Sequence, residues 1–559
     1  MIKQVLIAAF TNAAEMARNA GRLNYDTLPA FTLERPANPA FGDLSANLAM
    51  VLASQTKMST RKVAQILVDN LRIPDEIVER IEIAGPGFVN LYLKPTWLHE
   101  TLRAIHQQGD AYGRGTLGQG KRVLAEYVSA NPNGPLSIPH GRGAIIGDVL
   151  CNVLEWTGYD VSREFYVNDA ATSTQMVRFG ESLVVRYLQA FGQQIEFPED
   201  GYHGEYVIEF ARRIKEQDGD KYLNIPAAER LELFTQMGKE AMIEWQREVL
   251  RSFGVEFDTW FRESQLFEEN EVEKCLQALA AHDATYEAEG AVWLASTKYG
   301  DDKDRPLVRS NGKPTYLASD VAYHRNKFER GFQTLIDIWG PDHHGYVART
   351  KAAMAALGYD PESIHVLIYQ VVRLLRNGEF VMGGKRKGDI ILLSELIEQV
   401  GKDAARFFFL LRSADSDLNF DLDLAVKESP DNPVYYVQYA HARIASILRL
   451  AEEKGVALPD PQTADLSPLD SDAEVALIRR LSDLPEEVLT VAELYEPHRL
   501  TRYAQDLARE FHVFYDRCPV LKEDTPDNIR DARLVLIGAS KIALKNVLTL
   551  LGVSAPERM

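Results

Sequence analysis

Cysteine is scarce, with three residues in a chain of 559, and the three are far apart. Cys151, Cys275 and Cys518 show no paired spacing, which excludes a cysteine zinc site and suits a reducing compartment. No apolar run approaches the length that spans a membrane, and the first residues lack the pattern of a cleavable signal. We therefore expect a cytoplasmic protein without a membrane partner.

A basic excess is also missing, because the formal net charge is -19. An acidic total argues against a general nucleic-acid coat and a DNA partner, although a local basic surface on one face stays open. Hydrophobic residues make up 46% of the chain, which is enough for substantial cores. The length predicts two to four domains.

The stretch from Val123 to Val167 has the pattern of a strand, a loop, a helix and a second strand. A short apolar run ends at Val128, a Pro- and Gly-rich turn follows over 131–135, and apolar residues then recur at helical intervals before a second apolar run. In such units ligands bind where the first strand meets its helix, and the free N–H groups of the helix start favour phosphate. This stretch is therefore a candidate site, with His140 at the helix start.

Neither common glycine motif for nucleotides is present. Gly141, Gly143 and Gly147 miss the dinucleotide spacing by one residue and fall inside the predicted helix. In the stretch 378–388, Gly384 stands where a P-loop needs Lys, and no Ser or Thr follows the Lys. Cations among glycines still suit phosphate, so this stretch is either a phosphate-binding loop or a solvated basic hairpin tip.

Two carboxylates stand out by their surroundings. Glu126 lies in an apolar strand, where an unpaired charge is costly, so we expect it to meet a cation or a set of donors; a solvated strand-end Glu is the alternative. Tyr316 and Asp320 are four residues apart and share one face if that segment is helical. A carboxylate beside an aromatic ring suits a guanidinium, and an exposed helical Asp is the alternative.

Three further predictions concern other parts of the chain. Asp43 is expected to cap a helix carrying Leu44, Leu48 and Leu52. Alternating apolar residues on both sides of the Gly-Pro-Gly turn at 85–87 predict a strand pair. The sequence Asp342-His343-His344 follows an apolar run and can indicate a metal, although no further ligands lie close in the sequence.

Together these motifs resemble the arginyl form of the class I aminoacyl-tRNA synthetases. The string Ser-Ala-Asn-Pro-Asn-Gly-Pro-Leu-x-x-x-His-Gly-Arg-Gly-Ala is similar to the first signature of that family, with Ser137 and Pro139 in place of the usual His and Gly. Other similar stretches follow in the family's order, including Arg-Glu-Phe-Tyr-Val-Asn-Asp-Ala, the segment with Tyr316 and Asp320, and a degenerate second signature around Lys385. The resemblance spans essentially the whole chain.

The resemblance implies an α/β fold with a class I Rossmann-like parallel sheet, an N-terminal α/β domain and a C-terminal helical bundle. The expected domains are residues 1–115, which contact the tRNA elbow, 116–424, which are catalytic and carry an insertion at about 181–305, and 425–559, which bind the anticodon. The implied reaction is ATP-dependent attachment of L-arginine to tRNA through an arginyl-adenylate. Mg²⁺ would accompany ATP, and the protein would be a monomer.

The resemblance also assigns site residues. Catalytic roles fall to His140 and Lys385, and no residue is assigned to a metal. ATP contacts are expected from Ser137, His140, Gly141, Gly340, Asp342, His343, Met382 and Lys385. Arginine contacts are expected from Glu126, Ser129, Asn131, Tyr316 and Asp320. The residues expected to contact tRNA are Phe88, Asn90, Tyr436 and Met559.

Two other hypotheses stay open at this point. The altered signatures would also suit a catalytically weakened paralogue that binds tRNA or a partner protein. A ligase for another amino acid is the third possibility, and Asp320 argues against it. Phe88 and Tyr436 have a structural alternative as well, because aromatic residues at such spacing are often part of a core.

Overall fold

The protein is described by a computed structural model over residues 2–36, 38–169, 174–381 and 391–559. The chain forms two compact units. One contains residues 1–112, 443–485 and 509–543, and the other contains residues 113–442, 486–508 and 544–559. The C-terminal region therefore contributes to both units.

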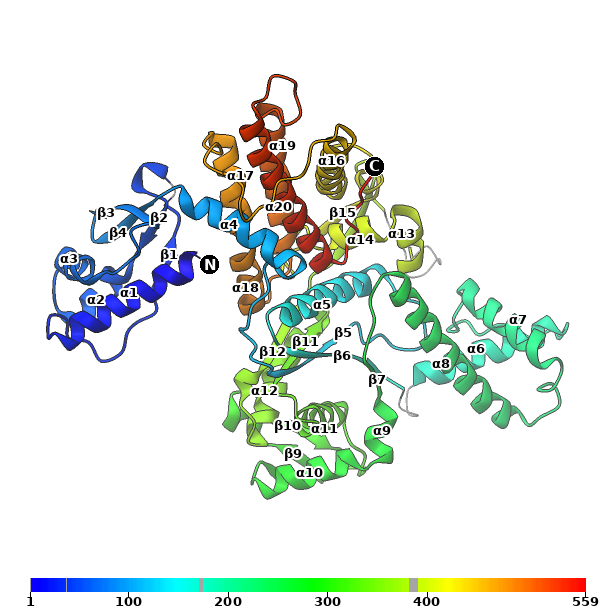
Figure 1. Cartoon of the computed structure of the whole chain (residues 1–559). Coiled ribbons are helices and arrows are strands. Elements are labelled where there is room, and N and C mark those ends of the chain that lie inside the picture. Colours follow the sequence, from blue (N-terminus) through cyan, green and yellow to red (C-terminus); the bar gives the residue numbers. More distant parts are fainter. Residues whose placement is uncertain (1, 37, 170–173, 382–390) are drawn as a thin grey trace. The chain divides into compact units, whose positions relative to one another are not determined.

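An antiparallel sheet in the order β1-β2-β4-β3 is the centre of the N-terminal part (Figure 1). Its strands are β1 (Leu33–Glu34), β2 (Leu44–Ala46), β3 (Val78–Ala84) and β4 (Phe88–Leu93). The helices of this part of the chain are α1 (Ile2–Asn19), η1 (Pro39–Phe41), α2 (Leu48–Thr56), α3 (Thr60–Asn70), α4 (Thr96–Gln108) and η2 (Gly109–Ala111). The pairing of β3 with β4 confirms the predicted strand pair.

The helix cap predicted at Asp43 is wrong. Residues 44–46 form the strand β2, and α2 begins only at Leu48. Asp43 instead accepts a hydrogen bond from the Leu93 N–H (2.9 Å). The backbone of β2 is satisfied by pairing with β4, about 45 residues further along the chain, and a local pattern cannot reveal such a partner.

The second unit contains a parallel sheet in the order β12-β11-β5-β6-β7. Its strands are β5 (Arg122–Tyr127), β6 (Asp160–Val167), β7 (Thr259–Arg262), β11 (Thr334–Trp339) and β12 (Ile364–Ile368). The predicted strand–loop–helix–strand unit is confirmed as β5, α5 (Ile138–Trp156) and β6. Helix α5 covers one face of the sheet, and α11 (Tyr316–Glu329) covers the other (Figure 1).

Successive residues of β5 face these two helices in turn. Leu124 packs with Val321 of α11 in one hydrophobic cluster, whereas Tyr127 contacts Gly147 of α5. A Cβ atom on Gly147 would lie 2.4 Å from Cγ of Tyr127, and one on Gly143 would lie 2.8 Å from Cε1 of Tyr369. These two glycines therefore allow α5 to approach the sheet closely.

Replacement of Gly147 by alanine is expected to destabilise the protein by about 1–3 kcal/mol, because the added methyl group over-packs the interior. The Tyr127 ring is fully buried and has no room to move aside. Urea denaturation would measure the loss. Gly345→Ala is the control, since its Cβ would meet no atom closer than 3.8 Å. An unchanged urea midpoint for Gly147→Ala would contradict this account.

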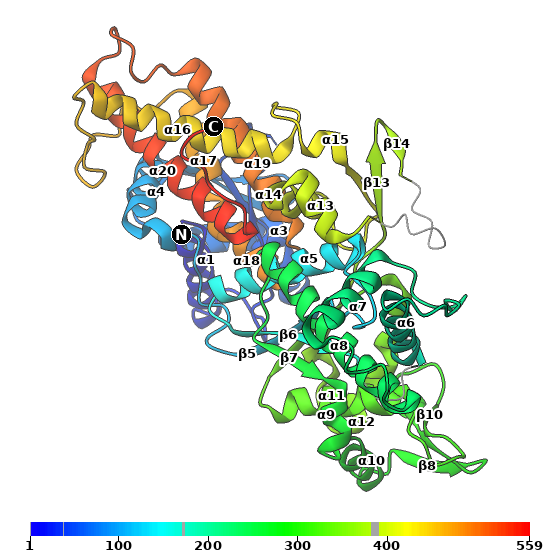
Figure 2. The ribbon, with the colours of Figure 1, turned by 90° about the vertical axis from the view of Figure 1, so that its right-hand side faces the viewer.

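Between β6 and β11 the chain builds additional parts around the sheet. Helices α6 (Thr174–Ala190), α7 (Glu205–Asp218) and α8 (Ala227–Ser252) share a hydrophobic core and lie together (Figure 2). After β7 come α9 (Glu263–Glu268), α10 (Glu271–Ala281), β8 (Thr285–Ala288), β9 (Ala291–Leu294), η3 (Ser296–Tyr299) and β10 (Arg305–Val308). The range 181–305, predicted as an insertion, thus includes β7, which is a strand of the parallel sheet.

The rest of the second unit continues after β11. Its elements include η4 (Pro341–Tyr346), α12 (Val347–Ala356), η5 (Pro361–Ser363), β13 (Val372–Arg376), β14 (Glu379–Phe380), α13 (Leu393–Val400), α14 (Lys402–Phe409), β15 (Leu418–Asp421) and α15 (Leu422–Ala425).

The predicted C-terminal helical bundle is confirmed by α16 (Pro433–Glu453), α17 (Asp472–Ser482), α18 (Leu484–Leu494), α19 (His498–Arg517) and α20 (Asp527–Leu551).

Helix α20 is long and apolar enough to cross a membrane by length and composition alone. This helix is an exception to the expectation that no apolar run approaches membrane-spanning length. Its most apolar window is 72% buried inside the protein, which is the behaviour of a core helix.

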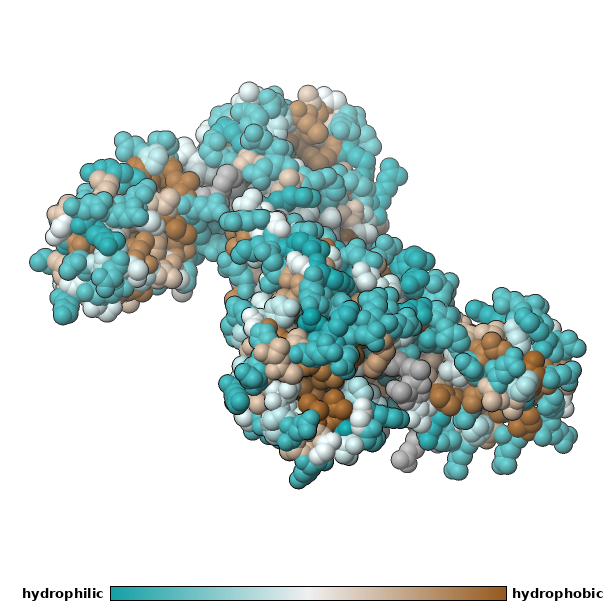
Figure 3. Space-filling view, turned by 90° about the horizontal axis from the view of Figure 1, so that it is seen from below, coloured by the Kyte–Doolittle hydropathy of each residue, from teal (hydrophilic) through white to brown (hydrophobic). Residues whose placement is uncertain are grey.

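The face shown in Figure 3 is mainly hydrophilic, and apolar residues form separate patches on it.

Candidate active site

The order of the parallel strands reverses between β5 and β11. From β5 the chain proceeds to β6 on one side, whereas β11 pairs with the other side of β5. In sheets of this kind ligands bind in the crevice beyond the carboxyl ends of the strands at the reversal. The segments 128–137 and 340–346 begin at those two strand ends. The fold therefore places two of the predicted signature segments on adjacent strands.

The chain leaves β5 through two residues with left-handed backbone. Val128 has a φ angle of 70° and Ser129 one of 42°, and a β-branched residue rarely adopts such a conformation. The Ser129 hydroxyl donates to Glu126 (2.8 Å) and accepts from the Tyr166 N–H (3.2 Å). Backbone strain of this kind, about 1–3 kcal/mol per residue, persists where surrounding contacts enforce it and is common at functional sites.

His140 lies in the first turn of α5 and caps the helix. Its Nδ1 accepts a hydrogen bond from the Ser137 N–H (3.1 Å), and the Ser137 hydroxyl lies 3.1 Å from the same nitrogen. Burial lowers the pKa of His140 to about 4, so the ring is neutral at pH 7. A neutral ring that accepts at Nδ1 carries its hydrogen on Nε2. His140 can therefore donate from Nε2 to an anionic group.

The loop that precedes α5 is fixed by the helices inserted after β6. Gln246 of α8 is buried, and its Nε2 donates to the carbonyl oxygens of Asn131 (3.1 Å) and Gly134 (2.9 Å). Asn133 donates to the Tyr202 hydroxyl (3.0 Å). The backbone of this loop is thus anchored, while Asn131 itself remains exposed.

Tyr316 and Asp320 lie one turn apart at the start of α11, which confirms that their segment is helical. Tyr316 is 71% exposed, and Asp320 is half-buried. Burial raises the pKa of Asp320 to about 6, although the nearby positive groups oppose this. No hydrogen bond or ion pair to the Asp320 carboxylate is present among the residues that the structure describes. A partly desolvated carboxylate without a partner suits an incoming cation.

Glu126 meets a cation, as its position in an apolar strand predicted. Lys327 of α11 is fully buried, and its Nζ lies 2.6 Å from Glu126 and 2.8 Å from Asp337 of β11. His324 joins the same group, because its Nε2 lies 3.0 Å from Asp337 and its Nδ1 lies 2.7 Å from the backbone oxygen of Asp320. The carboxylates of Glu126 and Asp337 are therefore paired within the protein.

A third buried carboxylate, Glu164 of β6, stands beside Glu126 in the register of the sheet. It accepts two hydrogen bonds from Arg330 (2.6 and 2.8 Å) and one from the Tyr323 hydroxyl (2.6 Å). We define the buried charge cluster as Glu126, Glu164, Asp337, His324, Lys327 and Arg330. Of these carboxylates only Glu126 was predicted from the sequence, although Glu164 and Asp337 also lie inside apolar strands.

The segment after β11 presents the residues predicted to surround ATP. Gly340 is half-buried, whereas Asp342 and His343 are exposed in η4. The His343 ring packs near those of Trp339 and Tyr346, with centroids 5.9 and 5.4 Å apart. Across the described ranges, no group of three His, Cys, Asp or Glu side chains is arranged to hold a metal ion. The segment is thus a strand-end loop at the crevice.

Met382 and Lys385 of the second signature lie outside the described residues. The structure is described again from Ile391. There the Leu393 N–H donates to the carbonyl oxygen of Leu136 (2.9 Å), and Leu392 forms a β-bridge with Ser137. The residues that follow the second signature are therefore joined to the start of α5.

The residues predicted to contact tRNA differ in exposure. Asn90 is buried on β4 and accepts a hydrogen bond from the Ser45 hydroxyl (2.8 Å), while Phe88 is half-buried. Tyr436 is half-buried on α16, and Met559 is 54% exposed. Of these four side chains, that of Met559 is the most accessible to a partner.

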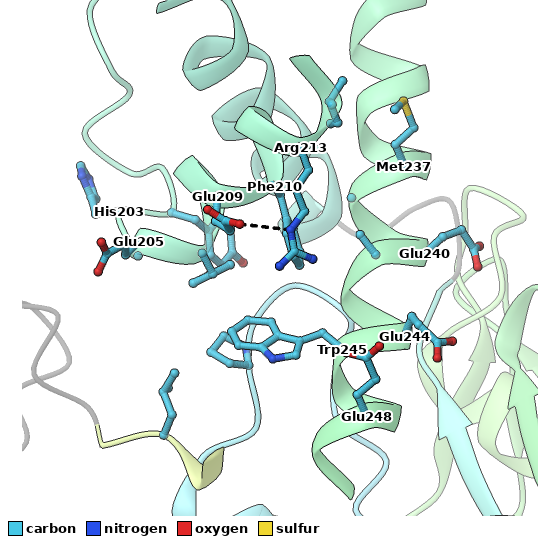
Figure 4. Close-up of a pocket in the computed structure, with 18 of the residues that line it drawn as sticks. His203, Glu205, Glu209, Phe210, Arg213, Met237, Glu240, Glu244, Trp245 and Glu248 are labelled. Atoms are coloured by element: carbon cyan, nitrogen blue, oxygen red, sulfur yellow. Dashed lines mark hydrogen bonds and ion pairs between the residues drawn. The ribbon is translucent and has the colours of Figure 1, made fainter. Parts of the chain in front are cut away.

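A large cleft of about 1620 Å³ lies next to the crevice, between α7 and α8 (Figure 4). Phe210 and Trp245 contribute aromatic rings to it, and Arg213 pairs with Glu209 (3.2 Å). The remaining acidic side chains in its lining are Glu205, Glu240, Glu244, Glu248 and Glu395. So many carboxylates would repel a triphosphate, and we therefore do not expect ATP to bind in this cleft.

Comparisons with known proteins identify three matching regions. Residues 1–93 match the arginyl tRNA synthetase N terminal domain. Residues 101–409 match the class I (R) tRNA synthetase catalytic domain, and residues 437–559 match the DALR anticodon binding domain. The three matches follow one another along the chain in the order that the sequence motifs predicted.

Full-length relatives agree with these regions. Arginine–tRNA ligases from Moorella thermoacetica and Heliobacterium modesticaldum are 50% and 48% identical to the chain, and each comparison covers 100% of the chain and 99% of the relative. The solved arginyl-tRNA synthetase of Thermus thermophilus has the same fold, with a TM-score of 0.76 at 24% identity over 99% of this chain and 100% of that one. The chain therefore belongs to the arginine–tRNA ligases, a family of class I aminoacyl-tRNA synthetases.

Proposed function

We propose that the crevice at the carboxyl ends of β5 and β11 is where this enzyme joins L-arginine to ATP and then to tRNA. In the first step the arginine carboxylate attacks the α-phosphorus of ATP, and pyrophosphate leaves. In the second step a hydroxyl group at the 3′ end of the tRNA attacks the carbonyl carbon, and AMP leaves. Mg²⁺ enters with ATP as part of the substrate. Such chemistry depends mainly on placing the reactants and stabilising charge on the phosphate.

The observation that carries this proposal is the half-buried Asp320 carboxylate beside the crevice, which lacks a partner among the described residues. A guanidinium is planar, always charged and able to donate two hydrogen bonds to one carboxylate. The exposed ring of Tyr316 lies one turn away on the same helix and offers a face for stacking. The side chain of arginine satisfies both groups together.

The backbone groups of arginine are assigned to Glu126, Ser129 and Asn131. One oxygen of Glu126 accepts from Lys327 and the other from Ser129. Each carboxylate oxygen has two lone pairs, so Glu126 can still accept from the substrate's ammonium group. The strained turn at 128–129 and the anchored loop hold these groups in place before the substrate arrives.

ATP is assigned to the start of α5, the loop after β11 and the second signature. His140 donates from Nε2, and the helix start, which includes Gly141, offers free N–H groups. Gly340, Asp342 and His343 lie at the neighbouring strand end, and Met382 and Lys385 come from outside the described residues. Ser137 offers a hydroxyl, although it also bonds to His140.

His140→Ala is expected to lower turnover at least tenfold and to leave tRNA affinity nearly unchanged. The variant loses a hydrogen bond to a charged phosphate, which is worth about 1.5–3 kcal/mol, or about 10–150-fold in rate. Steady-state aminoacylation and tRNA binding would measure the two effects. Thermal unfolding serves as the control, because His140 also caps α5 and a lost cap costs about 1 kcal/mol. A silent His140→Ala would show that this loop does not hold the phosphates.

The assignment of whole regions follows the same proposal. Residues 1–115 and 425–559 bind tRNA at its elbow and anticodon, with Phe88, Asn90, Tyr436 and Met559 as contacts, and residues 116–424 carry the chemistry. We further propose that the enzyme acts in the cytoplasm as a monomer. The DALR match at 437–559 supports anticodon binding by the C-terminal region.

The deciding experiment is the charging of total tRNA with each amino acid in turn in the presence of ATP. Arginine alone should be attached, despite Ser137 and Pro139 in the first signature. Tight tRNA binding without ATP consumption would instead favour a catalytically weakened paralogue. Charging with a different amino acid would overturn the guanidinium assignment of Asp320.

A further inference from the structure

We propose that His324 is a positioning residue that carries protons on both ring nitrogens at neutral pH and thereby holds Asp320 ionised and correctly placed for the guanidinium of arginine. This inference rests on the proposed role of Asp320 in binding arginine. His324 belongs to the buried charge cluster, and nothing in the sequence motifs assigned it a role. Its proposed role follows from the two hydrogen bonds that its ring nitrogens form.

Both partners of the His324 ring can only accept hydrogen bonds. Nδ1 lies 2.7 Å from the backbone carbonyl oxygen of Asp320, which has no hydrogen to donate. Nε2 lies 3.0 Å from a carboxylate oxygen of Asp337. Burial alone would raise the pKa of Asp337, but the charge of Lys327, whose Nζ donates to it (2.8 Å), holds this pKa below its ordinary value, so the carboxylate is ionised. Each ring nitrogen must therefore donate, and a ring that donates from both is an imidazolium.

The balance of charge in the cluster leads to the same conclusion. Glu164 is neutralised by Arg330, which donates to it twice. Lys327 is then the single remaining lysine or arginine of the cluster for two carboxylates, Glu126 and Asp337. A buried unpaired carboxylate is costly, and a protonated His324 supplies the missing positive charge. If the His324 ring were neutral, Asp320 would lie near two carboxylates, Glu126 and Asp337, that share the single positive charge of Lys327.

Other groups near Asp320 do not replace this cation. Arg349 also lies near Asp320, but its guanidinium donates to the Gly345 carbonyl oxygen (3.1 Å) and lies 4.2 Å from the Tyr346 ring centre. Tyr166 has its pKa raised well above the ordinary value by burial and by nearby carboxylates, so it is neutral. Lys327 is committed to Glu126 and Asp337. His324 is thus the cation bonded to the same helical turn as Asp320.

The ring is also fixed in place. It packs edge-on against Tyr323 and Trp339, with centroids 5.7 and 6.4 Å away, and His324 is buried. Its bond to the Asp320 carbonyl oxygen joins successive turns of α11, and its bond to Asp337 joins α11 to β11. A movement of His324 would therefore displace the backbone that carries Asp320.

The protonation state can be read in the full-length enzyme by NMR of ¹⁵N-labelled histidine at about pH 7.5, where an ordinary exposed histidine is neutral. The His324 signals are those that disappear in His324→Gln or, if that variant does not fold, in His324→Lys. We expect both ring nitrogens of His324 to carry hydrogen, and the signals of the exposed His282 serve for comparison. A neutral His324 ring under these conditions would overturn the inference.

Kinetics provide a second test that a merely structural role would not pass. Loss of a nearby positive charge raises the pKa of a carboxyl group by about one unit or more, so His324→Gln should raise the KM for arginine about tenfold at about pH 6 and recover towards the wild-type value at about pH 8.5. The KM for ATP should not change. His324→Lys keeps a cation and should keep the wild-type pH dependence. His282→Gln is the control for loss of a distant exposed histidine.

The proposed role of Asp320 and the proposed role of His324 can be disproved separately. A loss in His324→Gln that is the same at every pH would overturn the role of His324 in keeping Asp320 ionised. If Asp320→Asn leaves arginine use intact, the assignment of Asp320 itself fails. If Asp320→Asn is damaging and the His324 ring is nevertheless neutral, only the present inference fails.

Discussion

Replacement of Asp320 by asparagine is expected to lower kcat/KM for arginine by about 30-fold or more and to leave the KM for ATP within about twofold. Asparagine keeps the shape of the side chain but removes the charge that faces the guanidinium. A desolvated cation left without its partner costs about 2–5 kcal/mol, and about 1.4 kcal/mol corresponds to a factor of ten. Aminoacylation at varied arginine and then at varied ATP would separate the two effects.

The same carboxylate should make arginine use depend on pH. The pKa of Asp320 is raised to about 6 by burial in the enzyme without substrate, whereas a guanidinium stays charged at every pH of interest. Only the ionised carboxylate pairs with arginine, so protonation competes with binding. The KM for arginine should be constant above about pH 7 and rise towards about tenfold per pH unit below pH 6. This acid limb should be absent in Asp320→Asn.

Glu329→Gln is the matched control, because Glu329 is an exposed carboxylate on the same helix that pairs with Arg325 instead of facing the crevice. It removes one negative charge from α11 and should leave arginine use unchanged. If Asp320→Asn charges arginine within about threefold of wild type, the effect is below about 1 kcal/mol. Asp320 would then not determine specificity.

The local patterns of the sequence were sufficient for the elements that bear the site. The apolar run ending at Val128, the Pro- and Gly-rich turn and the helical spacing after His140 predicted β5, the loop and α5 because each signal lies within a few residues of its element. The position of Tyr316 and Asp320 on one helical face was predictable for the same reason. These are short-range features, and the sequence displays them directly.

Features that depend on distant partners could not be predicted in this way. A cation beside Glu126 followed from the cost of a buried charge, but its identity did not, because Lys327 is 201 residues away. Asp43 lies before a segment that pairs as a strand, although its local pattern suits a helix cap. The raised pKa of Asp320 depends on how deeply α11 packs against the sheet, which only the assembled structure reveals.

Replacement of Arg406 by methionine is expected to lower the free energy of unfolding of the second unit by about 3–5 kcal/mol. The Arg406 side chain on α14 is 1% exposed and bonds to three other elements. Its Nε donates to the carbonyl oxygen of Leu551 (2.9 Å), its Nη1 donates to those of Phe253 (3.1 Å) and Gly254 (3.2 Å), and its Nη2 pairs with Asp148 of α5. Methionine fills a similar volume but leaves Asp148 and three carbonyl oxygens without these donors.

Urea denaturation of this variant would measure the loss, and a second substitution would separate its causes. In Arg406→Met with Asp148→Leu the buried carboxylate is removed together with its partner, so part of the stability should return, because an uncompensated charge is the larger cost. Arg309→Met controls for loss of an exposed arginine and should change little. Because Asp148 lies on α5, whose first turn carries His140, the single variant should also slow aminoacylation even where it remains folded. A loss below about 1 kcal/mol, or a double variant less stable than Arg406→Met, would contradict the view that this guanidinium holds α5, α8, α14 and α20 together.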